Sequence, residues 1–352
     1  MAPRIVTRDE LAGAARAALG TRRRLERVER LAGGTRKGVY RLTMDDATTA
    51  IAYLWAAAES YWPATPWDGD LADPFSSGAG LGLFEAARAR LDALGLRVPA
   101  LYLVDSDRSH YPSDLAIVED FPGEDLMEFL ARDPRAAQPT MSRLAEALEA
   151  MRRHRAPAYG KVALIDGGGM AHGTSCEAVA LDFALRCLAE AAGRDHRAAS
   201  ARDRLEERLR SLAASVRPRA EYSVVHGELG LDHIMVDREG LPVLIDIEDL
   251  MYFDVEWEHV FLRIRLHADY RHVAVDDLDE NRLALYMLAQ RLSLTAGPLR
   301  LLDSDFPDRE FVRGIVEHNL KEALAWTAGT TSPALTACCS RRCWPGVVSQ
   351  SR

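Results

Sequence analysis

Three side chains between residues 224 and 248 have the types and spacing of one reaction site. Glu228 follows a His-Gly pair, His233 lies five positions later, and Asp246 follows a short apolar run. A carboxylate can accept a proton, while an imidazole and a second carboxylate can hold a divalent cation. Phosphoryl transfer requires these groups, so the pattern favours that chemistry.

A β-hairpin is expected to position two of these side chains. Two apolar runs flank the Gly- and Pro-containing connection 237–242, a pattern typical of paired strands. Pairing of Val236 with Val243 would set His233 opposite Asp246, with their Cβ atoms about 5 Å apart. The sequence therefore predicts a base and two metal ligands on one rim.

The same stretch resembles the signature of the aminoglycoside phosphotransferase family, which reads HGDxxxxN followed by an IDxE strand end. This family is the small-molecule branch of the protein-kinase-like fold. The resemblance implies that Glu228 orients an acceptor hydroxyl and takes its proton, and that His226 supports the catalytic loop by packing and hydrogen bonding. It also implies that His233, Asp246 and Glu248 hold Mg²⁺ against the phosphates of ATP, with GTP left open as the alternative donor.

Two positions depart from that signature. Glu228 is one methylene longer than Asp, which moves the base roughly 1–1.5 Å and can cost on the order of a hundredfold in rate unless the pocket suits it. His233 replaces Asn, and an imidazole suits softer divalent ions better than Mg²⁺. It could instead hydrogen-bond a phosphate or Glu228. Asp232 is an alternative ligand, but in an extended segment its side chain would point to the other face.

A Gly-containing segment at 31–42 resembles the nucleotide loop of the family. Glycines let backbone amides approach phosphates closely. The residues assigned to nucleotide binding here are Gly33, Gly34, Thr35, Lys37 and Gly38. The strand expected at 49–55 lacks the phosphate-binding lysine of kinases, and Lys37, Arg41 and Lys161 are the candidates to replace it.

A helix is predicted at 84–95, followed by a strand at 98–104, from apolar spacing and the glycine at the helix end. This pair is similar to the helix and strand that follow the nucleotide loop in the family. The resemblance makes Glu85 the partner of the phosphate-binding lysine. An exposed helix glutamate is the alternative interpretation.

The strand expected at 114–119 resembles the one that enters the hinge between two lobes. Glu119 and Phe121 are therefore assigned to nucleotide binding by position, through backbone contacts to adenine. Helical periodicity then dominates, with helices predicted at 126–130, 141–155, 178–192 and 202–216. The chain is expected to be an α+β protein with the two-lobed protein-kinase-like fold.

Three regions follow from this assignment. Residues 1–120 are expected to form a β-rich, nucleotide-binding N-lobe, and residues 121–329 a mainly helical C-lobe with the catalytic and metal site. The segment 330–352 changes to Thr, Ser, Pro, Cys and Arg without periodicity, so a disordered tail is predicted there. Asp254 and Glu256 are acids expected to be solvated, with a substrate contact as the alternative.

Composition limits the functional classes. The chain has 352 residues and a net charge of −9, which argues against general nucleic-acid binding and would tolerate a cationic substrate. The N-terminus has no long apolar segment, and no stretch approaches the roughly 20 apolar residues that span a bilayer. A cytoplasmic protein without a membrane partner is therefore expected, and the oligomeric state stays open.

The resemblance implies an ATP-dependent phosphotransferase that acts on a hydroxyl of a small molecule. An aminoglycoside or another antibiotic is the acceptor that the family suggests. Two alternatives remain open at this point. One is a kinase-like protein that binds a ligand but transfers no phosphate, and the other is a kinase for a metabolite such as choline, homoserine or a sugar.

Overall fold

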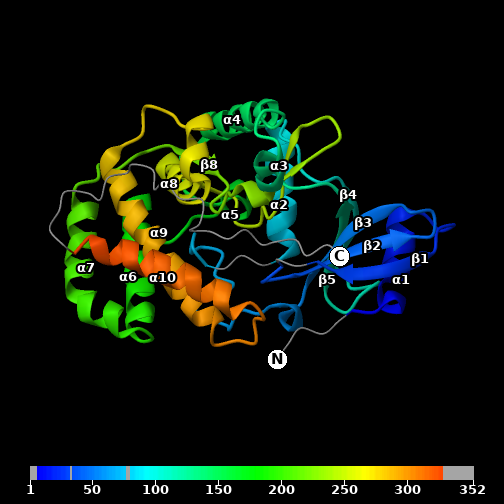
Figure 1. The fold of residues 1–352 in the computed structure, drawn as a ribbon, viewed down its shortest axis with the longest axis horizontal. Coiled ribbons are helices and arrows are strands. Elements are labelled where there is room, and N and C mark those ends of the chain that lie inside the picture. The colour runs from blue at the N-terminus through cyan, green and yellow to red at the C-terminus, as the bar shows by residue number, and fades with distance from the viewer. Residues whose placement is uncertain (1–5, 32–33, 77–79, 328–352) are drawn as a thin grey trace.

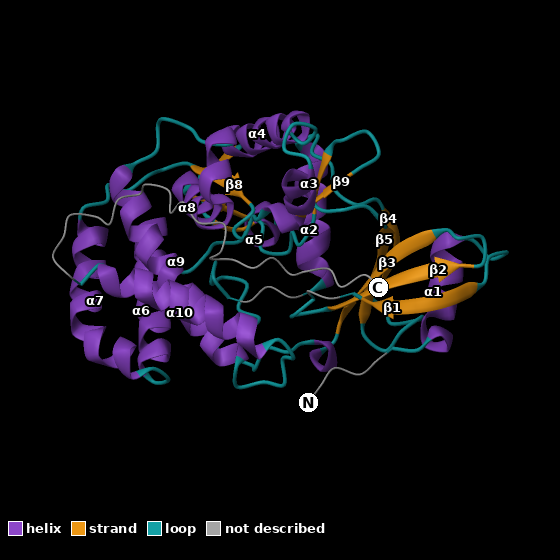
Figure 2. Ribbon diagram, in the orientation of Figure 1, coloured by secondary structure: helices purple, strands orange, loops and turns teal. Residues whose placement is uncertain are grey.

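The computed structural model describes residues 6–31, 34–76 and 80–327. The chain forms two lobes, with an antiparallel sheet in the smaller lobe and mostly helices in the larger one (Figure 1, Figure 2). The predicted α+β class is therefore confirmed. Gly33 and the predicted tail at 330–352 lie outside the described residues.

The smaller lobe is a five-stranded sheet with the order β1-β2-β3-β5-β4. Its elements are α1 (Arg8–Leu19), β1 (Leu25–Arg30), β2 (Gly38–Met44), β3 (Thr49–Trp55), α2 (Leu81–Ala93), β4 (Leu101–Asp105) and β5 (Asp114–Glu119). The central strand β3 is buried along both faces, because α1 covers one face and α2 the other. The bounds of β3 agree with the strand predicted at 49–55.

Two hydrophobic cores result from this arrangement. One lies between α1 and the sheet and contains Leu11, Leu42 and Leu115. The other includes Ile51 of β3 and Phe84 of α2 and extends through the larger lobe to Trp326. The shared second core means that α2 couples the sheet to the helical lobe.

Helices make up most of the larger lobe. They are α3 (Leu126–Arg132), α4 (Gln138–Arg153), α5 (Val162–Asp166), α6 (Cys176–Ala192), α7 (His196–Ala214), α8 (Val255–Leu266), α9 (Glu280–Leu301) and α10 (Arg309–Ala325). Side chains of Asp125, Ser175, Asp195, Asp279 and Asp308 accept backbone N–H groups at helix starts, as N-capping residues do. The periodic segments predicted to be helical are thus helical, with shifted ends.

Short strands carry the motif region of this lobe. A four-stranded sheet has the order β6-β8-β11-β7, and a separate hairpin pairs β9 with β10. Their bounds are β6 (Arg155–Ala156), β7 (Gly160–Lys161), β8 (Tyr222–Val225), β9 (Ile234–Val236), β10 (Pro242–Leu244) and β11 (Met251–Phe253). The loop after β8 holds the His-Gly-Glu sequence, and the 3₁₀ turn η2 (Leu231–His233) precedes β9.

The hairpin forms, but the predicted register is wrong by one residue. Val236 pairs with Pro242, and the N–H of Ile245 donates to the carbonyl of His233 at 3.0 Å. The cause is the side chain of Asp237, which accepts two backbone N–H groups of the turn at 2.9 Å. These bonds close the turn one residue earlier than expected.

A segment between β3 and α2 crosses from the sheet to the helical lobe. We call residues 56–76, which include the 3₁₀ turn η1 (Ala57–Glu59), the cross-lobe segment. Its Phe75 stacks on Phe183 of α6 with ring centres 4.4 Å apart, and Tyr61 packs edge-on against Phe306 at 5.3 Å. The chain is therefore joined across the lobes at a second place besides the β5–α3 connection.

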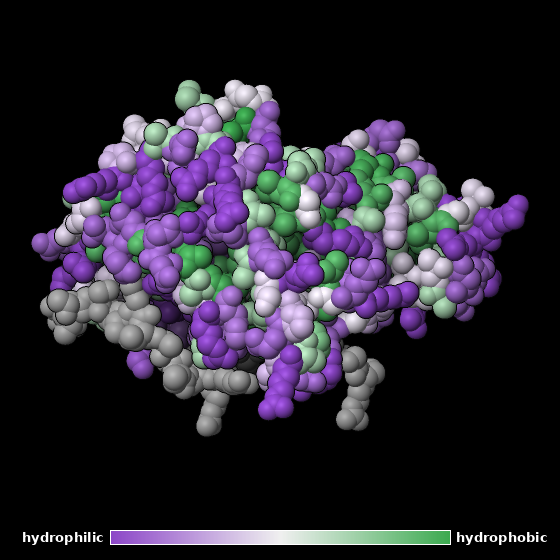
Figure 3. All heavy atoms as spheres, turned by 90° about the horizontal axis from the view of Figure 1, so that it is seen from above, coloured by the Kyte–Doolittle hydropathy of each residue, from purple (hydrophilic) through white to green (hydrophobic). Residues whose placement is uncertain are grey.

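Hydrophilic side chains cover most of the face drawn in Figure 3. Among the described residues the exposed large apolar side chains are Leu71, Tyr102 and Met170. No described helix is both long and apolar enough to cross a bilayer.

Candidate active site

The catalytic loop after β8 is held from beneath by α8. The backbone N–H groups of His226 and Gly227 donate to Oε2 of Glu258 at 2.5 and 3.0 Å. Gly227 has φ +92°, a conformation that favours glycine. Glu258 was not singled out from the sequence, although an acid among the apolar residues of one helix is a signal for a buried anchor.

His226 is fully buried beneath the loop. Its Nε2 lies 3.0 Å from the carbonyl oxygen of Ile245, which can only accept, so Nε2 carries the proton. Burial lowers the pKa of His226 to about 4. The imidazole is therefore neutral near pH 7 and joins the loop to the end of β10.

Glu228 follows this anchored pair and its side chain is exposed. Surrounding protein atoms still remove enough water to raise the pKa of this carboxyl, and the charge of Asp249 raises it further, while Arg36 opposes the shift. A carboxylate with a raised pKa is a better proton acceptor than an ordinary one. Glu228 is thus suited to the role of general base.

His233 has one ring nitrogen fixed and one available. Its Nδ1 lies 3.0 Å from the carbonyl oxygen of Glu228, so Nδ1 carries a proton and, in the neutral imidazole, Nε2 is the acceptor. That Nε2 faces Oδ2 of Asp246 at 3.8 Å. Two acceptors that face each other suit a shared cation, and a backbone bond on the far nitrogen is typical of a metal-binding histidine.

Asp232 is not available as a substitute ligand. The segment forms the η2 turn rather than an extended strand, and both carboxylate oxygens of Asp232 accept from Arg265 of α8. Burial would raise the pKa of Asp232, but the charges of Arg265 and His233 outweigh it, so the pKa is lowered. The pair instead fastens the η2 turn to α8.

Lys37 of the nucleotide loop reaches across to the end of β10. Its Nζ donates to Oδ1 of Asp246 at 2.8 Å and also to Oε1 of Glu248. Burial alone would lower the pKa of Lys37, but these two charges raise it, and Lys37 in turn holds the pKa of Asp246 well below its usual range. The ammonium lies 4.9 Å from the ring centre of Tyr53 on β3, beside the strand that lacks a lysine.

The other two candidates for the phosphate-binding cation are engaged elsewhere. Arg41 binds Asp120 through two bonds of 2.8 and 3.1 Å, and Lys161 binds Asp249 at 2.8 Å. Glu85 is exposed on α2, and no ion pair joins it to Lys37 in the described part of the chain. The geometry thus pairs Lys37 with Glu248 and leaves Glu85 on the surface.

The nucleotide loop itself is tightly packed around Lys37. The loop is closed by a bond of 2.8 Å from the N–H of Leu31 to the carbonyl of Val39. A Cβ on Gly34 would lie 2.8 Å from the carbonyl oxygen of Lys37, and one on Gly38 would lie 2.6 Å from Oε2 of Glu59. Both positions therefore require glycine for space, and half-buried Thr35 lies between them.

The hinge residues have their side chains turned to the protein. Glu119 accepts from Arg97 with both oxygens at 2.7 Å, and the Phe121 ring is buried beneath Arg97 at 5.3 Å. The N–H of Glu119 already donates to the carbonyl of Ala100 at 2.8 Å. Any contact of Glu119 with adenine would therefore use another backbone group.

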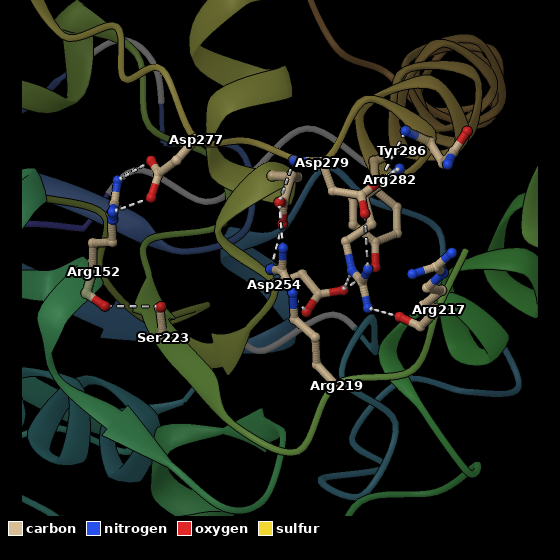
Figure 4. Close-up of polar contacts among 11 residues, drawn as sticks. Arg152, Arg217, Arg219, Ser223, Asp254, Asp277, Asp279, Arg282 and Tyr286 are labelled. Atoms are coloured by element: carbon tan, nitrogen blue, oxygen red, sulfur yellow. Dashed lines mark hydrogen bonds and ion pairs between the residues drawn. The ribbon is translucent and has the colours of Figure 1, made fainter. Parts of the chain in front are cut away.

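Asp254 and Glu256 are not solvated, so that expectation was wrong. They are buried at the start of α8, in the cluster drawn in Figure 4. Asp254 accepts from Arg282 at 2.7 Å and from Tyr286 at 2.5 Å, while Glu256 accepts two bonds of 2.7 and 2.6 Å from Arg219. These acids stabilise the junction of α8 and α9.

The side chains at this site could hold a divalent cation, but only together with a bound nucleotide. In the part of the chain that the structure describes, no three His, Cys, Asp or Glu side chains are grouped closely enough to hold a metal alone. His233 and Asp246 offer one nitrogen and one oxygen, and the phosphates of a bound nucleotide would supply further oxygens, as is usual for Mg²⁺ in kinases.

A model of the phosphotransferase enzyme family (APH) matches residues 28–292. The chain belongs to this family. The suspected resemblance and the kinase-like fold are thereby confirmed, and the match covers the nucleotide loop, the hinge and the motif region. No curated protein matches the chain.

Solved structures of the phosphotransferase family show the same fold. The choline kinase LicA from Streptococcus pneumoniae is 14% identical, with a TM-score of 0.59 over 92% of this chain and 99% of LicA. APH(2")-IIIa in complex with GDP and kanamycin is 18% identical, with a TM-score of 0.56 over 87% and 95%. A thermostable APH(4)-Ia mutant with AMP-PNP and hygromycin B is 15% identical, with a TM-score of 0.55 over 91% and 100%.

Replacing Lys37 by Met should weaken nucleotide binding and also destabilise the fold. A bond from a charged group is worth about 1.5–3 kcal/mol, so the affinity for AMP-PNP should fall by about 10- to 100-fold by isothermal titration. Breaking a buried ion pair costs roughly 3–5 kcal/mol, and urea unfolding measures this loss of stability.

Adding Glu248→Gln to the Lys37→Met variant should restore the stability but not the affinity for AMP-PNP. Lys161→Met is the matched control, and equal loss of affinity in that variant would contradict the role of Lys37.

Glu258 should make stability fall as the pH rises. Burial raises its pKa to about 7, so the folded protein holds this proton more tightly than the unfolded chain does. The resulting stability is complete below the ordinary pKa of 4.5 and is lost as the pH passes through 7, by on the order of 3 kcal/mol. Urea unfolding at pH 5 and pH 8 measures the change. Glu258→Gln should remove it, and an unchanged difference between the two pH values would refute this assignment.

Proposed function

We propose that this protein is an ATP-dependent phosphotransferase that moves the γ-phosphate to a hydroxyl of a small molecule. The observation that carries the proposal is Lys37, which joins the nucleotide loop to Asp246 and Glu248 beside the exposed carboxylate of Glu228. A cation for phosphates, carboxylates for a metal and a base for a hydroxyl are thus adjacent. The family match and the nucleotide complexes of the related structures support the same conclusion.

In the proposed reaction Glu228 orients the acceptor hydroxyl and takes its proton. The acceptor oxygen forms a bond to the γ-phosphorus, the bond from that phosphorus to the bridging oxygen of ADP breaks, and its electron pair leaves with ADP. Lys37 binds the phosphates and stabilises their charge. Gly34, Thr35 and Gly38, with Gly33 outside the described residues, cover the phosphates, and the backbone near Glu119 and Phe121 receives adenine.

His233 and Asp246 are the residues that would hold a divalent cation with the nucleotide, with Glu248 beside them. When bound, Mg²⁺ or a softer ion neutralises charge on the phosphates. His233 would bind the cation through Nε2, because its Nδ1 is engaged by the carbonyl of Glu228. The same bond ties the metal ligand to the backbone of the base.

A cationic acceptor suits the charges around Glu228. Asp249 is half-buried nearby, Asp246 is exposed, and the whole chain carries a net charge of −9. The related structures include proteins solved with kanamycin and hygromycin B and a choline kinase, so both an aminoglycoside and a small quaternary amine belong to the acceptor class proposed here. A protein that binds nucleotide without transfer is the opposing candidate, favoured by the Asn-to-His change at His233.

Glu228→Gln should abolish transfer and keep nucleotide binding. Loss of a general base costs roughly 10²- to 10⁴-fold in kcat, measured as ADP release from ATP with kanamycin, hygromycin B and choline. The AMP-PNP affinity should stay within about threefold, because the substitution keeps size and removes only one charge. Glu221→Gln, at the exposed residue directly before β8, is the control. A wild-type protein that binds ATP or GTP but releases no ADP with any acceptor would instead be a binding protein.

The preference of the site for Mn²⁺ over Mg²⁺ should depend on the imidazole of His233. The wild-type protein should bind AMP-PNP with Mn²⁺ about tenfold more tightly than with Mg²⁺, because a nitrogen ligand favours the softer ion. His233→Asn should remove most of that difference by restoring an oxygen ligand. Isothermal titration with each ion gives the ratio directly, and an identical ratio in both proteins would exclude His233 as a ligand.

A further inference from the structure

The cross-lobe segment, residues 56–76, holds the nucleotide loop by two contacts. The N–H of Tyr61 donates to the carbonyl of Thr35 at 2.9 Å. The guanidinium carbon of Arg36 lies 4.5 Å from the centre of the Trp62 ring, a distance at which a cation is attracted to an aromatic face. The tip of the loop is therefore fixed from the side of the helical lobe.

Trp62 is itself braced by α9. A Cβ on Gly297 would lie 3.4 Å from the Trp62 ring, an ordinary van der Waals distance, so the ring lies directly against the surface of α9. The guanidinium of Arg300 lies 5.6 Å from the same ring centre and is anchored to Glu190 of α6 at 2.9 Å. The ring that holds Arg36 is thus fixed to the lobe that carries Glu228.

Arg36 differs from the other cations considered for phosphate binding. Lys37, Arg41 and Lys161 each bind a carboxylate, whereas no described carboxylate forms an ion pair with Arg36. The side chain is only half-buried, and it directly precedes Lys37, whose ammonium binds Asp246 and Glu248. An oriented guanidinium without a carboxylate partner, next to the proposed phosphate-binding lysine, is available for an anionic ligand.

We propose that Arg36 is a catalytic residue that contacts the transferring phosphoryl group, and that Trp62 is the positioning residue that keeps it there. This inference rests on the proposed phosphotransferase function. Lys37 would bind the phosphates on the side of Asp246 and Glu248, and Arg36 would meet the phosphoryl oxygens on the side of Glu228. Its planar N–H groups suit the charge that spreads over those oxygens as the bond to ADP breaks.

A purely structural contact is the competing explanation, and the chain contains a matched example. Arg186 of α6 lies 5.5 Å from the ring centre of Trp67 in the same cross-lobe segment. Unlike Arg36, it also binds a carboxylate, Asp73, at 2.7 Å. Loss of the Arg186 contact should affect only how the segment packs, so Arg186→Met is the control for Arg36→Met.

The test compares Arg36→Met, Arg36→Lys, Trp62→Leu, Trp62→Phe and Arg186→Met in the full chain. One readout is kcat for ADP release from ATP with kanamycin, hygromycin B and choline. The second is the affinity for ADP with and without aluminium fluoride, which mimics the phosphoryl group in flight. A role in the transition state changes kcat and the fluoride complex but leaves ADP binding alone.

Arg36→Met should lower kcat by about 10²-fold or more and remove most of the gain in ADP affinity that aluminium fluoride gives. Arg36→Lys should recover part of kcat and part of the gain in ADP affinity. Trp62→Leu should lower kcat about tenfold, whereas Trp62→Phe should keep the wild-type kcat. If Arg36→Met behaves like Arg186→Met in both readouts, the contact is structural and the proposal is overturned. If the wild-type protein neither releases ADP nor gains affinity with aluminium fluoride, the phosphotransferase function itself fails.

Discussion

The buried ammonium of Lys37 is the interaction on which the site depends. It places one positive charge between Asp246 and Glu248, two carboxylates that would otherwise repel each other at the end of β10. Because Lys37 comes from the sheet lobe and both acids come from the helical lobe, the same contact fixes where the nucleotide loop meets the hairpin. Burial strengthens the attraction between Lys37 and Glu248, since water screens that pair little, whereas Asp246 is exposed. In the proposed function, this lysine of the loop takes the phosphate-binding role of the strand lysine of kinases.

The rest of the site is arranged around backbone groups rather than around free side chains. Glu258 orients the loop through two N–H groups, His226 binds the carbonyl of Ile245, and His233 binds the carbonyl of Glu228. Each of these bonds holds the backbone next to one of the proposed site residues Glu228, His233 and Asp246. Preorganisation of this kind lets a site act without spending energy on rearrangement.

Features set by local sequence pattern could be predicted, whereas features set by side-chain contacts between distant residues could not. The motif spacing and the strand at 49–55 were recovered because periodicity and the glycine turn specify them. The hairpin register was missed because the side chain of Asp237 closes the turn. Lys37 could not be chosen over its rivals, since its reach depends on how the lobes meet. Glu258 was overlooked because an acid in a helix usually faces water, and only tertiary packing turns it inward.

The cluster of Asp254 and Glu256 with Arg219 and Arg282 has an evolutionary consequence. Loss of one member leaves an uncompensated buried charge, which costs far more than replacing a whole pair by apolar residues of similar volume. Single substitutions at these positions should therefore be rare among relatives, and paired ones tolerated. The four positions are expected to covary, and an alignment of relatives would show each acid lost together with its arginine.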